Sequence, residues 1–146
     1  MSISAINMKE MSKIMSIELW MLTIAAALQF TIVVTHGVHI FFTAGMWWGI
    51  GRRNTARTVS DLGRRIERTL INNMEGLAIF VPLVLVVQLA SVSSPLTQFA
   101  AQAYIALRIV FALLYISNIP YIRTFVWIGG QACLAILAFA ILATGL

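Results

Sequence analysis

Four long apolar segments, separated by short polar connectors, set the pattern of this 146-residue chain. Each has about the 20 apolar residues that an α-helix needs to cross the hydrocarbon core of a bilayer. Before the third segment, Ser94-Pro95 is typical of an N-cap followed by proline in the first helical turn. The pattern predicts four membrane-spanning helices joined by tight turns, over residues 17–47, 69–90, 99–117 and 124–144.

The composition agrees with a membrane protein. Hydrophobic residues make up 60% of the chain and charged residues only 10%, whereas about 25% of a soluble domain is charged. We therefore expect an all-α fold, an integral-membrane four-helix bundle that forms one domain over residues 1–146. The net charge of +5 comes from residues near helix ends, which does not favour nucleic acid as a partner.

The positive charges also suggest an orientation. Arg52, Arg53 and Arg57 lie on the first connector and Arg123 on the third, while the second connector has no charge. The positive-inside rule then places the first and third connectors in the cytoplasm and both termini outside, although lysines near the N-terminus run against it. The membrane would be the bacterial inner membrane, or the endoplasmic reticulum in a eukaryote.

Candidate chemistry begins with a polar stripe at the start of the second segment. Arg64, Arg68, Asn72 and Glu75 are spaced by 4, 4 and 3 residues, which places them on one helical face. Ionisable groups inside a membrane are costly and usually face a bundle interior or a water-filled cavity. This stripe is therefore the first place to look for a site.

A second buried charge is predicted at the depth of the stripe's inner end. Glu75 and Arg108 each lie about 10 residues, or about 15 Å, from the cytoplasmic side, so we expect them to pair near the midplane. One hypothesis is a structural link between two helices. The other is the floor of a polar funnel, with Tyr115 and Arg123 nearer its mouth, that receives a small soluble anion.

These residues resemble the MAPEG family, the membrane-associated proteins in eicosanoid and glutathione metabolism. The family pattern Glu-Arg-x-x-Arg-Ala-x-x-Asn-x-x-Glu is matched by Arg65, Arg68, Asn72 and Glu75, but Arg64 and Thr69 depart from it. A second block is similar to the third helix and final cytoplasmic turn of the family: Ala106-Leu107-Arg108, Tyr115, a proline-containing turn and Arg123. The resemblance covers nearly the whole chain and is closest in type to a bacterial or microsomal glutathione transferase.

The resemblance implies a homotrimer in which glutathione, as co-substrate, binds between protomers while a hydrophobic small molecule or lipid enters from the bilayer. Carried over by position, Arg123 would lower the thiol pKa, and Tyr115 would contact the glutathione backbone or sulfur. No metal or bound redox cofactor is expected. The other implied glutathione contacts are Arg68, Asn72 and Glu75 at the γ-glutamyl end, Arg108 at the floor, and Arg52 or Arg53 at the glycine carboxylate.

Two hypotheses for function remain open. The first is a membrane glutathione transferase or peroxidase, which activates the glutathione thiolate against lipophilic electrophiles or lipid hydroperoxides. The alternative is a non-enzymatic MAPEG-like protein that binds a lipid or regulates a partner, because Phe111 stands where several family enzymes have His or Tyr. A transporter is disfavoured, since no polar path continues into the outer half. His36 and His39 are expected to form helix–helix hydrogen bonds rather than a metal site.

Overall fold

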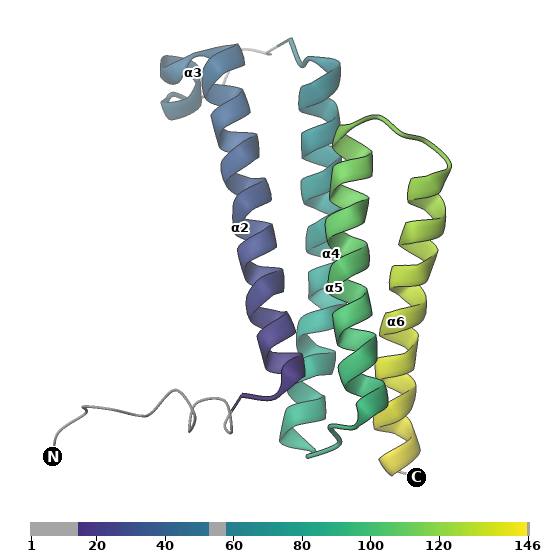
Figure 1. The fold of residues 1–146 in the computed structure, drawn as a ribbon. Coiled ribbons are helices and arrows are strands. Elements are labelled where there is room, and N and C mark those ends of the chain that lie inside the picture. The colour runs from purple at the N-terminus through teal and green to yellow at the C-terminus, as the bar shows by residue number, and fades with distance from the viewer. Residues whose placement is uncertain (1–14, 53–57, 146) are drawn as a thin grey trace, which may run out of the picture.

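A computed structural model describes residues 15–52 and 58–145 of the chain. Helices are the only regular secondary structure within these ranges, which confirms the predicted all-α fold. Four helices are long and apolar enough to cross a membrane, as an integral multi-pass protein requires. In chain order the helices are α2 (Ile17–Ala44), α3 (Met46–Ile50), α4 (Asp61–Leu89), α5 (Pro95–Ile116) and α6 (Ile122–Gly145) (Figure 1).

The four long helices run alternately up and down (Figure 1). Helix α3, the start of α4 and the α5–α6 connection lie at one end, and the α4–α5 turn lies at the other. The arginines flanking the first and third connections therefore share one end of the bundle, as the sequence pattern predicts. Arg53 and Arg57, like the two N-terminal lysines, lie outside the described residues.

The first helix differs from the predicted span of residues 17–47. Helix α2 ends at Ala44, and Gly45 has φ 82°, a left-handed conformation that glycine adopts without a Cβ penalty. The residues after Gly45 are also apolar, so hydropathy alone predicts one uninterrupted helix across this position. They form the short, separate helix α3.

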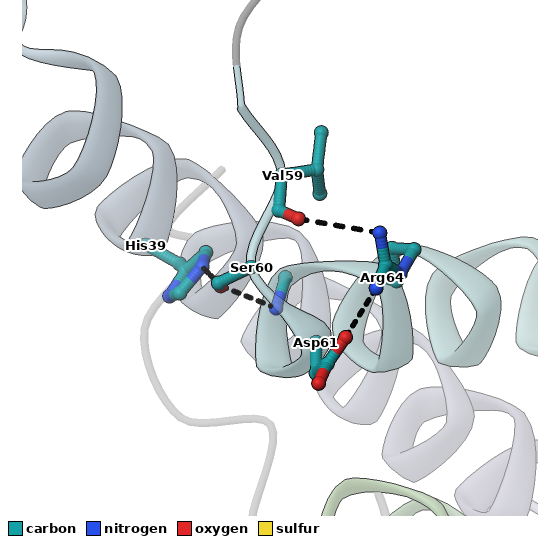
Figure 2. Close-up of polar contacts among 6 residues, drawn as sticks. His39, Val59, Ser60, Asp61 and Arg64 are labelled. Atoms are coloured by element: carbon teal, nitrogen blue, oxygen red, sulfur yellow. Dashed lines mark hydrogen bonds and ion pairs between the residues drawn. The ribbon is translucent and has the colours of Figure 1, made fainter.

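The start of α4 is fixed by a serine cap (Figure 2). The Ser60 hydroxyl accepts a hydrogen bond from the Gly63 amide at 3.1 Å. The same hydroxyl is hydrogen-bonded to His39 Nε2 at 3.1 Å, which confirms the helix–helix contact predicted for this histidine. Arg64 forms an ion pair with Asp61 and donates to the Val59 carbonyl (Figure 2). Helix α4 therefore begins at Asp61, well before the apolar residues that mark its predicted span.

The core lies where the four long helices meet, with Ala25 as the contribution of α2. Phe80 of α4 and Tyr104 of α5 stack with their ring centroids 4.5 Å apart, and Leu137 of α6 belongs to the same buried cluster. Many large apolar side chains point outward instead, including Phe30 and Phe42 at 69% and 79% exposure, as a bilayer-facing surface requires. The predicted Ser94 cap of α5 is confirmed: its hydroxyl accepts from the Thr97 amide at 3.3 Å.

Candidate functional site

Arg108 is a buried charge at the middle of the bundle, with only 5% of its surface exposed. Its Nη1 donates to the side-chain oxygen of Asn72 at 2.7 Å, and its Nε donates to the Tyr104 hydroxyl at 2.9 Å. Tyr104 precedes Arg108 by four residues, so both lie on one face of α5. The hydrogen bonds offset part of the cost of placing a guanidinium in a bilayer.

The predicted ion pair between Glu75 and Arg108 is wrong for this protomer. Within the described residues the salt bridge is Arg64–Asp61, and the Glu75 side chain is exposed. Asn72, one turn earlier on α4, takes the guanidinium bond instead. Sequence depth places Glu75 and Arg108 at the same level, but it does not distinguish neighbouring turns of one helix.

Glu75 and Arg108 do line one cavity, called here the inner cavity, with a volume of about 170 Å³. Helix α4 supplies its acidic and amide groups, α5 its guanidinium, and α6 the opposite wall. The cavity is thus lined by one negatively charged group, the Glu75 carboxylate, and one positively charged group, the Arg108 guanidinium, both at membrane depth. Its lining includes Asn72, Glu75, Gly76, Arg108, Trp127 and Gln131.

A second hollow, called here the mouth cavity, lies next to the inner cavity and has a volume of about 240 Å³. Asn72 and Trp127 line both, so the two form adjoining parts of one polar region between α4 and α6. Arg123, in the first turn of α6, lines the mouth cavity together with Thr124 and Phe111. Because Arg123 and Thr124, at the start of α6, line the mouth cavity, the polar region reaches the end of the bundle where α6 begins.

The Arg123 guanidinium is held against an aromatic face. Its Cζ lies 4.5 Å from the centroid of the Tyr115 ring, within the range of a cation–π contact. Phe111 packs beside Tyr115 at a centroid distance of 5.5 Å and is itself 6% exposed. Tyr115 thus holds the Arg123 guanidinium at the mouth cavity, and within the described residues Arg123 forms no ion pair.

The structure brings some predicted site residues together and leaves others apart. Asn72, Glu75 and Arg108 share the inner cavity, and Arg123 with Tyr115 stands at the mouth. Arg68 and Arg52 are exposed and line neither cavity. Arg53 lies outside the described residues.

Three residues at the site are not singled out by the sequence reasoning. Tyr104 is hydrogen-bonded to Arg108, Gly76 lies against both side chains, and Trp127 lines both cavities. Tyr104 could have been identified from the sequence, because it lies four residues before Arg108 and therefore on the same helical face. Gly76 has a weaker signal, as a glycine directly after the intramembrane Glu75.

The arrangement suits a small anionic, partly polar ligand. Two guanidinium groups, Arg108 within and Arg123 at the rim, lie along one continuous region, with the Glu75 carboxylate lining its inner part. Guanidinium groups bind carboxylates and thiolates, and a carboxylate binds an ammonium group. A zwitterionic or multiply charged ligand with an extended shape would match these groups.

Comparison with known protein families identifies the family of this chain: a MAPEG family model matches residues 16–143. The chain belongs to the MAPEG family. The match covers nearly all of the four long helices and confirms the predicted resemblance. MAPEG proteins include glutathione transferases and members with other roles, so membership narrows the function without fixing the reaction. No curated protein and no solved structure matches the chain.

Proposed function

We propose that this MAPEG protein is a membrane glutathione transferase or peroxidase. The observation that carries the proposal is the Arg123 guanidinium, held 4.5 Å from the Tyr115 ring centroid at the rim of the mouth cavity. Arginine in this setting can face a ligand thiolate, because its guanidinium is permanently charged and is held beside the Tyr115 ring. Phe111 and Trp127 form the apolar part of the mouth cavity lining, beside the polar Asn72 and Thr124.

The role of Arg123 is to favour the thiolate of glutathione. A free thiol has a pKa near 8.5 and is only a few per cent ionised at neutral pH. An adjacent positive charge lowers such a pKa by about 1 to 3. The ionised fraction then rises severalfold or more, and the thiolate is the species that reacts.

Two reactions start from this thiolate. In conjugation, the thiol proton passes to solvent, a sulfur–carbon bond forms with a lipophilic electrophile, and the leaving group departs with its electron pair. In hydroperoxide reduction, the thiolate attacks the terminal oxygen and the O–O bond breaks, so the sulfur becomes a sulfenic acid. The lipid alkoxide takes a proton from solvent and leaves as the alcohol. A second glutathione then converts the sulfenic acid to glutathione disulfide and water.

The inner cavity supports the same assignment. Glu75 would bind the ammonium group of the γ-glutamyl end and Arg108 its carboxylate, with Asn72 beside both. Glu75 and Arg68 are exposed on the protomer. We propose that a neighbouring copy in a homotrimer covers this face and completes the glutathione site.

A second candidate function rests on Phe111. This residue lines the mouth cavity and cannot donate a hydrogen bond to a ligand. The alternative is therefore a non-enzymatic membrane protein that binds a lipid or regulates a partner in the same region. It predicts that loss of the Arg123 guanidinium leaves function intact.

Detergent-solubilised protein tests the proposal through glutathione binding and conjugation of a small aromatic electrophile. Wild-type protein is expected to show both, and Arg123→Ala to lose at least about tenfold in conjugation rate because its thiol is less ionised. Arg64→Ala is the matched control, since Arg64 is exposed, pairs with Asp61 and lines neither cavity. Absence of both binding and conjugation in wild-type protein would refute the proposal.

A further inference from the structure

Arg108 is held by two of its three guanidinium nitrogens. Nε donates to the Tyr104 hydroxyl at 2.9 Å, and Nη1 donates to Asn72 at 2.7 Å. Among the described residues Nη2 makes no hydrogen bond, although the side chain is only 5% exposed. This nitrogen is not one of the fully buried atoms without a partner, so it keeps access to the inner cavity, which Arg108 lines.

Tyr104 is rigidly placed. It is 1% exposed, its ring stacks on Phe80 at 4.5 Å, and the Arg108 Cζ lies 5.1 Å from its ring centroid. The packed core of the four long helices therefore sets the position of its hydroxyl. A guanidinium is planar, so fixing Nε on one side and Nη1 on the other fixes the direction of Nη2 as well.

Gly76 leaves the space that this arrangement needs. A Cβ at this position would overlap Nη2 of Arg108 and would lie 2.5 Å from the Tyr104 hydroxyl oxygen. The only flexible partner is the Arg108 side chain, which would have to give up its hydrogen bonds. Glycine in a helix interior lowers helix stability by about 1 kcal/mol relative to alanine. Here it leaves the space that the Arg108 guanidinium occupies.

We propose that Tyr104 and Gly76 are positioning residues, which together hold Arg108 with Nη2 directed at a carboxylate bound in the inner cavity. This inference rests on the proposed glutathione function for the identity of that carboxylate. Tyr104 acts through Nε, and Gly76 acts by leaving room for the guanidinium. Neither residue touches the ligand itself.

The binding test uses Tyr104→Phe and Gly76→Ala in the full-length protein. Tyr104→Phe keeps the stacked ring and removes only the hydroxyl. Gly37→Ala is the matched helix-glycine control, because a Cβ at Gly37 has no neighbouring atom within 4 Å. Calorimetry measures the affinities of glutathione and of its diethyl ester, whose carboxylates are blocked.

Wild-type protein and Gly37→Ala are expected to prefer glutathione to the ester. Tyr104→Phe and Gly76→Ala should each reduce that preference about tenfold, the effect of a lost hydrogen bond to a charged group. A variant that is only less stable would lower the affinities for glutathione and for its diethyl ester by the same factor. An unchanged preference in Tyr104→Phe, with a normal unfolding temperature, would overturn the inference.

A second readout needs no ligand. In ¹⁵N-labelled protein, the Arg108 Nε–H resonance is assigned by its loss in Arg108→Lys. We expect slow solvent exchange of this proton in wild-type protein and much faster exchange in Tyr104→Phe. If wild-type protein binds neither ligand, the proposed glutathione function is refuted, but the positioning role of Tyr104 is not. Equal exchange in wild type and Tyr104→Phe would separately overturn the positioning role.

Discussion

At the scale of single residues, Arg108 shows how the chain tolerates a charge within the membrane. An arginine at the centre of a membrane helix costs roughly 2.5–3.5 kcal/mol on insertion scales. Tyr104 and Asn72 accept two of its hydrogen bonds, and the burial of the side chain removes it from lipid. The remaining nitrogen, Nη2, makes no hydrogen bond with another described residue.

Phe111 lines the mouth cavity with a ring that cannot donate a hydrogen bond to the proposed ligand. It packs against Tyr115 and lines the mouth cavity together with Arg123. A hydroxyl added to its ring would therefore lie near polar groups of this cavity. Phe111→Tyr is expected to raise glutathione affinity severalfold, because one hydrogen bond contributes about 0.5–1.5 kcal/mol. Isothermal titration calorimetry on purified protein measures the change.

Phe111→Leu serves as the control for that substitution. It removes the aromatic contact without adding a donor, so its glutathione affinity should not exceed that of wild type. If Phe111→Tyr binds glutathione no better than wild type, the mouth cavity does not hold the ligand as proposed.

At the scale of elements, α2 is attached to the bundle by polar contacts at three levels. Near its start, the fully buried Glu18 accepts hydrogen bonds from Thr97 at 2.6 Å and from Ser93 at 2.9 Å. At its middle, Gln29 accepts from Asn73 at 2.6 Å, and near its end His39 is bonded to Ser60. These contacts matter because apolar side chains gain little from leaving lipid for another helix.

The Glu18 contact gives a stability prediction. Glu18→Leu removes the acceptor shared by Ser93 and Thr97, so it should lower the free energy of unfolding by about 1–3 kcal/mol. Glu18→Gln keeps a carbonyl acceptor of the same shape and should lose less. Unfolding in mixed detergent micelles, followed by circular dichroism, compares the variants. Equal stability of Glu18→Leu and wild type would show that this contact does not hold α2.

Much of the element pattern could be predicted from sequence, because apolar length and caps are local properties. The Ser94-Pro95 start of α5 and the spans themselves follow from the residues alone. The break at Gly45 was missed because the flanking residues are apolar on both sides. The partner of Arg108 was missed for a different reason: Asn72 and Glu75 are one turn apart, and only packing decides between them.

At the scale of the whole molecule, the arginines define one end of the bundle. Arg52 follows α3, Arg64 lies in the first turn of α4, and Arg123 lies in the first turn of α6, all at the same end (Figure 1). From the positive-inside rule we expect that end to lie in the cytoplasm. The mouth cavity would then open toward the compartment in which soluble glutathione is present.

Cysteine labelling in whole cells tests this orientation. The single cysteine, the buried Cys133, is first replaced by alanine. Thr58→Cys and Ser91→Cys then mark opposite ends at exposed positions. A membrane-impermeant maleimide should label Ser91→Cys in intact cells and Thr58→Cys only after permeabilisation. The reverse pattern would place the mouth cavity on the outer side.

The most direct measurement of the central claim is the thiolate absorbance that appears when glutathione is added to purified protein at neutral pH. The account predicts a rise that saturates with glutathione in wild type and in the Arg64→Ala control. In Arg123→Ala the rise should fall about tenfold, since the guanidinium that lowers the thiol pKa is gone. An equal rise in Arg123→Ala, or no rise in wild-type protein, would contradict the account.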